Sequence, residues 1–300
     1  MKRLASIVTL VTIFVMLVSL FGVAPAQADG KLRVFVQFAP GQKANVEKAL
    51  NGAGAEFHYA FDKLDTFVVS VPEAALKGLS RNPNVVMIEE DVLRYPISIM
   101  PSTAAEASAG DQVVPYGIDL VQARDVWDTD RDGTVDTGAP TGAGIKICII
   151  DSGFYTEHED LAGVDVDGYD GNLPWDQDGG GHGTHVAGTI VAMNNALGVV
   201  GVTPGTVSIY EVRVFGDDGT WAYSSTLVDA ANRCAAAGAK IISMSLGGSK
   251  SSRTERTAFD SLYSQGILPI AAAGNEGTTA LSYPAGYTSV VSVAAIDSTK

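Results

Sequence analysis

The chain has 300 residues, of which 46% are hydrophobic and 18% are charged, and its formal net charge is −14. This length and composition allow one large hydrophobic core with a smaller domain beside it, and they exclude an intrinsically disordered chain. The acidic balance also excludes nucleic acid as an expected partner, because phosphate backbones are bound by clustered positive charge.

The first segment has the pattern of an export signal. Two basic residues precede an apolar run over residues 7–23, and an Ala-x-Ala sequence at 26–28 supplies the small side chains of a cleavage position. A membrane anchor is the alternative, but the run is short and is followed by Pro25. We therefore predict a signal peptide at residues 1–28, a secreted extracellular protein and no stable membrane anchor after cleavage.

Residues 29–95 are predicted to form a small domain of strands and helices. The side chains from Lys31 onward alternate between apolar and polar, which predicts a strand. The expected elements are a strand from Lys31, a helix over 43–51, a strand over 61–71, a helix over 74–79 and a strand over 85–89. Residues 96–111 are rich in Pro, Ser, Ala and Gly and are predicted to be a linker.

Residues 112–300 are predicted to form an α/β domain with a parallel sheet. Apolar runs alternate with helical segments, and the runs are continuous, as expected when helices cover both faces of the sheet. The expected strands are 146–150, 207–214, 241–244 and 267–272, and the expected helices are 182–193 and 225–237. A functional site should lie at the carboxyl ends of these strands.

Only two cysteines are present, Cys148 in an apolar strand and Cys234 in a predicted helix. They could be two buried free thiols or one disulfide, and the sequence leaves both alternatives open. Neither has the neighbours expected of a nucleophile.

Polar residues occur where these strands end. Asp151 directly follows one strand, although such an Asp is commonly a turn former or a helix cap. His182 and His185 open a helix; their spacing would suit a metal, but the H-E-x-x-H arrangement is absent, so we expect one to be functional and the other structural. Asn275 follows another strand. A carboxylate, an imidazole and an amide at neighbouring strand ends predict a shared site.

Four sequence blocks resemble those of the subtilisin-like serine proteases. They are Asp151-Ser152-Gly153, the block from His182 to Gly188, Ser245-Leu246-Gly247-Gly248 and Ala273-Gly274-Asn275. The resemblance implies the subtilisin-like parallel sheet and an endopeptidase. It also implies that Asp151 orients His182, that His182 is the general base toward a serine, and that Asn275 donates to the oxyanion.

In this family, the peptide substrate lies as an extended strand between two segments of the protease. The matching residues here are Ser245, Leu246 and Gly247 on one side and Gly219, Thr220 and Trp221 on the other. Their glycines leave room for backbone pairing. Alternatively, both segments are simple strand ends.

Calcium is the expected cofactor, at two places. The resemblance implies a site formed by Gln112, Asp160, the side chain of Asn195 and the carbonyls of Met193, Leu197 and Val199. Separately, carboxylates recur before a glycine turn in the manner of D-x-D-x-D-G calcium loops, at Asp128, Asp130, Asp132 and Asp136. The usual glutamate at the twelfth position is replaced by Ala139, so a solvated acidic turn is the alternative.

The segment from Lys31 to Asp91 resembles the family's ferredoxin-like α+β propeptide, which assists folding and then inhibits the active site intramolecularly until it is removed. The linker to Gln112 is longer than in the family, so the mature chain is expected to begin between Tyr95 and Asp111.

The family's catalytic serine lies in a Gly-Thr-Ser-Met-Ala-Ser-Pro motif, which does not occur in residues 1–300. Ser152 and Ser245 belong to other family motifs. We therefore expect the domain to be incomplete, the serine to lie beyond residue 300 and the chain as given to be inactive. The alternative function is a non-catalytic truncated relative or pseudoprotease that acts as a secreted calcium-binding module.

Overall fold

The computed structural model describes residues 30–97 and 112–299. The predicted signal peptide at 1–28 and most of the predicted linker lie outside these residues. Within the two described ranges, no helix combines the length and the apolar character needed to cross a membrane.

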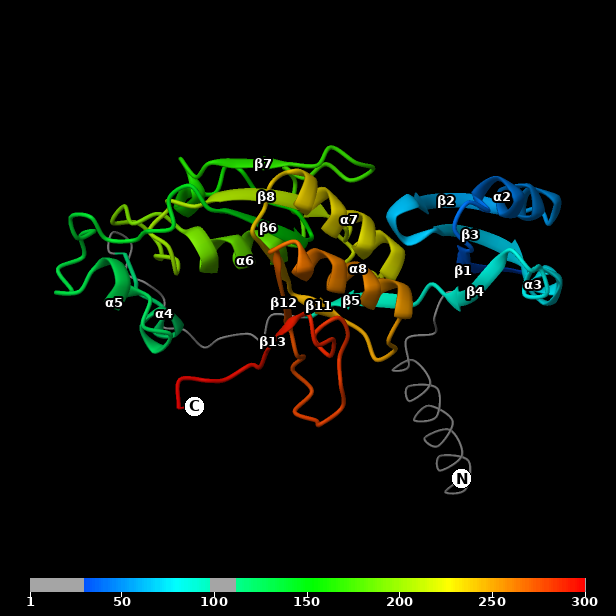
Figure 1. Ribbon diagram of the computed structural model, residues 1–300. Coiled ribbons are helices and arrows are strands. Elements are labelled where there is room, and N and C mark those ends of the chain that lie inside the picture. Colours follow the sequence, from blue (N-terminus) through cyan, green and yellow to red (C-terminus); the bar gives the residue numbers. More distant parts are fainter. Residues whose placement is uncertain (1–29, 98–111, 300) are drawn as a thin grey trace, which may run out of the picture.

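The small N-terminal domain is an antiparallel sheet with two helices (Figure 1). Its strand order is β2-β3-β1-β4. The bounds are β1 (Lys31–Phe38), α2 (Lys43–Gly52), β2 (Glu56–Phe61), β3 (Thr66–Pro72), α3 (Glu73–Leu79) and β4 (Val85–Glu90). The expected α+β domain is therefore present.

One predicted strand of this domain was wrong. The segment 61–71 is divided, because a 3₁₀ turn over Asp62–Leu64 separates the end of β2 from the start of β3. Asp65 adopts a left-handed conformation with φ of 46° and completes the reversal. Strand β2 was missed because its side chains are mostly exposed, so it carries no buried apolar run.

The small sheet has one face on its own helices and the other on the large domain. Val34 and Val36 of β1 pack in the core beneath α2 and α3. Phe35, between them in sequence, packs instead with Val228 and Ala258. These two residues belong to helices α7 (Ser224–Ala236) and α8 (Arg253–Ser264) of the large domain. The alternation of β1 thus builds both a core and a domain interface.

Two carboxylates at the end of the small domain cap these helices. Glu89 accepts backbone hydrogen bonds at the start of α8, including one from Thr254 N at 3.0 Å. Asp91 accepts one from Ser225 N at 2.9 Å at the start of α7. Carboxylates are favourable at helix N-termini, where backbone N–H groups have no helical partner. The small domain is therefore fixed to the large one by polar as well as apolar contacts.

The large domain contains the expected parallel sheet, with strand order β13-β12-β10-β6-β8-β7. The strands are β6 (Lys146–Asp151), β7 (Val166–Gly168), β8 (Ser208–Arg213), β10 (Ile241–Met244), β12 (Leu268–Ala272) and β13 (Val291–Val293). The other helices are α4 (Tyr116–Leu120), α5 (Arg124–Trp127) and α6 (His182–Val191). The predicted helices at 182–193 and 225–237 correspond to α6 and α7, whereas α8 and the three-residue β7 were missed.

Helices cover both faces of this sheet, as its continuous apolar strands indicate. In β6, Ile147 and Ile149 pack on the side of α6. The alternate residues, Cys148 and Ile150, pack on the side of α7 and α8. Strand β6 is therefore buried on both faces, and only its end can carry polar chemistry.

A second, three-stranded sheet of order β11-β5-β9 joins the two domains. Strand β5 (Leu93–Pro96) leaves the small domain and runs between β9 (Ala222–Tyr223) and β11 (Leu246–Gly247). The prediction that residue 96 begins a linker was wrong, because Pro96 pairs with Leu246 as part of β5. The ordered chain therefore continues beyond the small domain into the large one.

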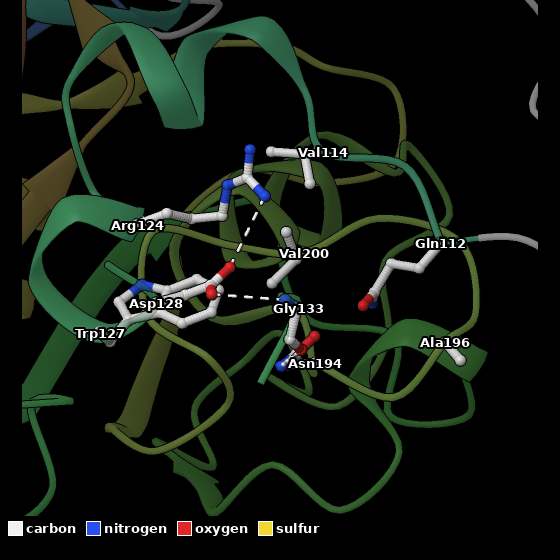
Figure 2. A pocket seen from close by; sticks show the side chains of 9 residues that line it. All are labelled: Gln112, Val114, Arg124, Trp127, Asp128, Gly133, Asn194, Ala196 and Val200. Carbon is white, nitrogen blue, oxygen red and sulfur yellow. Dashed lines mark hydrogen bonds and ion pairs between the residues drawn. The ribbon is translucent and has the colours of Figure 1, made fainter. Parts of the chain in front are cut away.

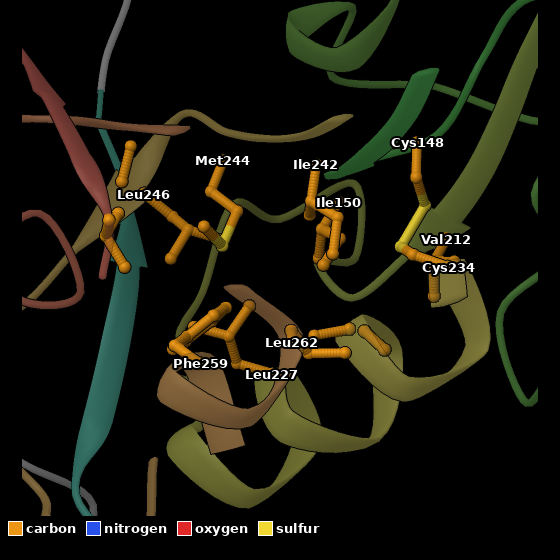
Figure 3. Close-up of a cluster of buried hydrophobic side chains, with 14 of the residues drawn as sticks. Cys148, Ile150, Val212, Leu227, Cys234, Ile242, Met244, Leu246, Phe259 and Leu262 are labelled. Carbon is orange, nitrogen blue, oxygen red and sulfur yellow. A yellow bond between two sulfur atoms is a disulfide. The ribbon is translucent and has the colours of Figure 1, made fainter. Parts of the chain in front are cut away.

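The two cysteines form a disulfide, which decides between the alternatives left open by the sequence. Cys148 of β6 is bonded to Cys234 of α7, and both side chains are fully buried. Figure 3 shows the bond at one end of the apolar cluster between the sheet and its helices. It closes a loop with a sequence separation of 86 residues.

We expect the double variant Cys148→Ala/Cys234→Ala to be less stable by about 4 kcal/mol, because a cross-link over a loop of this length strongly restricts the unfolded chain. Urea unfolding of the variant and the unmodified chain measures the difference. Dithiothreitol should lower the midpoint of the unmodified chain and leave that of the variant unchanged. Equal midpoints without reductant would show that the disulfide contributes nothing.

Candidate active site

The end of strand β6 and the start of helix α6 bring a carboxylate and an imidazole together. Asp151 is the last residue of β6 and is fully buried. His182 is the first residue of α6, and its Nδ1 lies 2.5 Å from Asp151 Oδ1. Asp151 Oδ1 also accepts a hydrogen bond of 2.7 Å from Ser152 N. The carboxylate is thus held in place while it contacts the imidazole.

Two glycines permit this close approach. Gly153 has φ of 117°, and a Cβ there would lie 2.0 Å from Gln177 O. A Cβ on Gly183 would lie 2.2 Å from Gly153 O. Any larger residue at either position would separate the strand from the helix. The glycines of the two sequence motifs are therefore required by backbone packing next to the Asp151–His182 pair.

Asp178 fixes the start of α6, and the sequence analysis missed it. Its Oδ1 accepts from Gly181 N at 2.9 Å and from Ser152 Oγ at 2.8 Å, and its Oδ2 accepts from Thr184 N at 2.8 Å. A carboxylate shortly before a helix is a capping signal that could have identified it. Asp178 thereby connects the helix that carries His182 to the loop that follows Asp151.

The surroundings of His182 favour its protonated form. The hydrogen bond to Asp151 raises the pKa of His182, and partial burial opposes that effect. With Asp151 on Nδ1, the other ring nitrogen, Nε2, is left to contact a different group. His185, the second histidine of the helix, is exposed and does not share these contacts. Desolvation and the neighbouring His182 lower the pKa of His185.

A backbone carbonyl occupies the position next to Nε2. Ile97 O lies 2.8 Å from His182 Nε2, and Ile97 N donates to Ser245 O at 2.9 Å. Ile97 immediately follows β5, whose extended chain pairs antiparallel with strands on both sides. The molecule therefore places one of its own peptide carbonyls beside the imidazole.

One strand beside β5 contains residues predicted for substrate binding, and the other lies directly after the second predicted segment. Leu246 and Gly247 pair with Pro96 and Tyr95, and Ser245 accepts from Ile97. On the other side, the pairing residues are Ala222 and Tyr223, which follow Gly219, Thr220 and Trp221 directly. The latter three residues form the irregular segment between a turn at 217–218 and β9, and the Trp221 ring lies 4.8 Å from that of Tyr223.

Asn275 lies in the loop after β12 and is exposed. Gly274 before it has φ of 110°, a conformation that favours glycine. The loop follows the carboxyl end of β12, at the same edge of the parallel sheet as Asp151 at the end of β6.

Oxygen atoms converge around the side-chain amide of Gln112. Its Nε2 lies 2.6 Å from Met193 O, 3.0 Å from Leu197 O, 3.0 Å from Val199 O and 3.5 Å from Asn195 Oδ1. An amide nitrogen has only two hydrogens for these four acceptors. With the amide reversed, Gln112 Oε1 would join an all-oxygen cluster of the kind that binds Ca²⁺.

Asp160 lies against the same loop and strengthens this fit. Its Oδ2 accepts from Val199 N at 3.2 Å. Its Oδ1 is buried and has no hydrogen-bond partner among the described residues. Gly198 allows the approach, because a Cβ there would lie 2.1 Å from Asp160 Oδ1. A buried carboxylate oxygen without a partner is costly unless a cation satisfies it. The residues present therefore fit a calcium ion.

Three of the four aspartates predicted for the second calcium site lie close together, and the fourth, Asp136, is bonded elsewhere. Oxygens of Asp128, Asp130 and Asp132 lie within 4.8 Å of one another. Asp136 instead accepts from Thr129 N at 2.9 Å. Buried Asp128 also lies 3.7 Å from Arg124 Nη1, which offsets part of its charge. Figure 2 shows Asp128 and Gln112 on opposite sides of one pocket. The oxygen cluster around Gln112 and the acidic group at Asp128 are therefore neighbours.

Comparison with known proteins places this geometry in a family. The model of the subtilase family, Peptidase S8, matches residues 142–300. Subtilisin E from Bacillus subtilis is 32% identical over 289 residues, an alignment that covers 91% of this chain and 69% of subtilisin E. Subtilisin DY from Bacillus licheniformis is 39% identical over 193 residues, covering 63% of this chain and 66% of that protein.

Two solved structures are also similar. The psychrophilic subtilisin-like protease Apa1 from Pseudoalteromonas sp. AS-11 has a TM-score of 0.54 and 45% identity, covering 63% of this chain and 42% of Apa1. Fervidolysin from Fervidobacterium pennivorans, a keratinolytic enzyme related to subtilisin, has a TM-score of 0.68 and 26% identity, covering 91% of this chain and 44% of fervidolysin. The chain thus spans less than half of each solved structure.

We expect the two histidines of α6 to titrate on opposite sides of the ordinary value of about 6.5, with the pKa of His182 above it and that of His185 below it. Proton NMR of the imidazoles measures both, with His182→Asn and His185→Asn for assignment. Asp151→Asn should lower the pKa of His182 and leave that of His185 nearly unchanged.

The same shift has a consequence for stability. Because folding raises the pKa of His182, its stabilising contribution is fully present below about pH 6.5 and is lost as the pH rises through the folded-state value. If both histidines titrated together near 6.5, the proposed control of His182 by Asp151 would be wrong.

Proposed function

Because this chain belongs to the subtilase family, we propose that it is the precursor of a secreted serine endopeptidase. The observation that carries the proposal is the Ile97 carbonyl, which lies 2.8 Å from His182 Nε2. Its chain is extended and paired on both sides, which is how a protease holds a peptide by its main chain. The cleft is thus shaped for a polypeptide with a peptide carbonyl next to a general base.

Each residue then has a definite chemical role. His182 Nε2 accepts the proton of a serine hydroxyl as that oxygen attacks the substrate carbonyl, and it later donates the proton to the leaving amine. Asp151 keeps the imidazole in the required tautomer and stabilises its positive charge. Asn275 donates to the oxyanion that forms on the carbonyl oxygen. We propose that the nucleophilic serine is encoded after Lys300.

The small domain acts as an intramolecular inhibitor in this proposal. Its apolar contact with α7 and α8 and the caps made by Glu89 and Asp91 hold it against the large domain. Residues 93–97 are thereby kept in the cleft. The inhibitory segment extends to Ile97, and we propose that maturation cleaves the bond between Ile97 and Ser98.

Calcium binding is the second part of the proposal. Gln112, Asp160, Asn195 and the carbonyls of Met193, Leu197 and Val199 would hold one ion, since their oxygens already face one another. Asp128, Asp130 and Asp132 would hold a second. A bound cation would neutralise clustered acidic groups and tie the loop 193–199 to the chain near Gln112. Millimolar calcium outside the cell and a disulfide both suit a secreted protein.

The complete gene product should process itself and hydrolyse casein, giving a mature N-terminus at Ser98. His182→Ala should remain unprocessed and lose activity by a factor of about 10² to 10⁴ or more, because the general base is removed. His185→Ala, on the same helix, is the matched control and should still be processed. Mass spectrometry and casein hydrolysis measure both effects. Normal processing of the His182→Ala protein would contradict the assignment.

Chelation by EGTA should lower the melting temperature of the purified chain, because an ion that binds only the folded state stabilises it by mass action. Saturation at 100 times the dissociation constant corresponds to about 2.7 kcal/mol. Asp160→Asn should reduce the response to EGTA, whereas the control Asp165→Asn, an exposed aspartate a few residues away, should keep it. An unmodified chain that does not respond to EGTA would exclude both calcium sites.

A further inference from the structure

We propose that this cleft selects an arginine at the fourth residue before the cleaved bond and that Glu255 is the residue that recognises it. This inference rests on the proposed function, in which residues 93–97 follow the path of a substrate. Ile97 is then the first residue before the bond, and Arg94 is the fourth. The expected substrates are polypeptides with arginine at that position.

The strand pairing fixes which side chain enters the large domain. Arg94 pairs with Ala222 of β9, and Tyr95 pairs with Gly247 of β11. Successive side chains of a strand point to opposite faces. Tyr95 is 46% exposed, whereas Arg94 is 0% exposed and is among the largest fully buried side chains. The fourth position is therefore the one whose side chain is enclosed by protein.

Glu255 receives this arginine through two parallel hydrogen bonds. Arg94 Nε lies 2.9 Å from Glu255 Oε1, and Arg94 Nη2 lies 2.5 Å from Glu255 Oε2. Both side chains are 0% exposed. The planar guanidinium matches a carboxylate in this way, whereas the ammonium group of lysine cannot form the same pair of bonds. The contact is therefore specific for arginine as well as for positive charge.

The acceptor belongs entirely to the large domain. Glu255 lies in the first turn of α8. Its backbone N donates a hydrogen bond to Ser252 Oγ at 3.2 Å. Tyr287 Oη accepts from Ser252 N at 2.8 Å and donates to Glu255 Oε2 at 2.7 Å. These contacts do not involve residues 30–97, so the carboxylate keeps its orientation after the small domain is removed. The pocket is thus ready for an arginine from another polypeptide.

Gly248 provides the space for the guanidinium. A Cβ at this position would lie 2.9 Å from Arg94 Nη1 and 2.6 Å from Leu93 O. Arg94 Nη1 in turn donates to Leu93 O at 2.9 Å. Each of the three guanidinium nitrogens therefore donates to an oxygen. Two of these oxygens belong to Glu255 and the third to Leu93. A neutral side chain in this pocket would leave the Glu255 carboxylate buried without a cation, which is strongly unfavourable.

The test uses the mature form of the complete gene product and peptides that carry Leu-Xaa-Tyr-Pro-Ile before the cleaved bond. Xaa is arginine, lysine, norleucine or glutamate. We expect kcat/KM for the arginine peptide to exceed that for the norleucine peptide by a factor of about 30 or more. Norleucine would leave the buried Glu255 carboxylate without a positively charged partner, which weakens binding by about that factor. Lysine should fall between them, and glutamate should be the poorest.

Two variants assign the preference to its residue. Glu255→Gln should lose most of the preference for arginine, while Asp260→Asn, an exposed carboxylate on the same helix, should retain it. The melting temperature of each variant, compared with that of the unmodified enzyme, verifies that it is folded. If Glu255→Gln does not fold, the peptide series with the unmodified enzyme still decides whether arginine is preferred.

The outcomes separate this inference from the proposed function. An enzyme that hydrolyses casein and cleaves all four peptides equally well would overturn the selection of arginine and leave the protease proposal intact. In that case, the pair of Arg94 and Glu255 would serve only to anchor the small domain. A complete gene product that hydrolyses neither casein nor any peptide would overturn the proposed function itself, and the selection of arginine with it.

Discussion

The contact between the end of β6 and the start of α6 is the constraint on which the site depends. Strand β6 is buried on both faces between Ile147 and Ile150, so the carboxylate of Asp151 stands at its carboxyl end. Gly153 and Gly183 let the helix approach until the His182 ring meets that carboxylate. The contact between Asp151 and His182 therefore depends on both glycines, and a larger residue at Gly153 or Gly183 would disrupt it.

The second feature of the molecule is that its own chain runs between β9 and β11 up to the imidazole. The small domain attaches to α7 and α8, and the chain then passes between β9 and β11 until Ile97 reaches His182. In the proposed function, residues 93–97 follow the path that a substrate peptide would take. The contact between Arg94 and Glu255 joins the end of the small domain to the large one, and in our proposal it also stands for the recognition of a substrate arginine.

The elements that the sequence predicted well have strong local signals. The long apolar strands, α6 and α7 follow from periodicity. The motifs shared with the family singled out Asp151 and His182, which the structure brings together, whereas the role of Asn275 stays a prediction. Strands β5, β9 and β11 have two to four residues each and no periodic pattern, and Pro96 indicated a break. Arg94 and Glu255 are charged, so composition places them on the surface. Their burial depends on a partner 161 residues away, which no local pattern reveals.

The most direct test of the central claim is to sequence the source gene beyond the codon for Lys300. The account predicts an open reading frame that encodes Gly-Thr-Ser-Met-Ala-Ser or a close variant, which would supply the nucleophile for His182. A stop codon directly after Lys300 would contradict the endopeptidase proposal for this product.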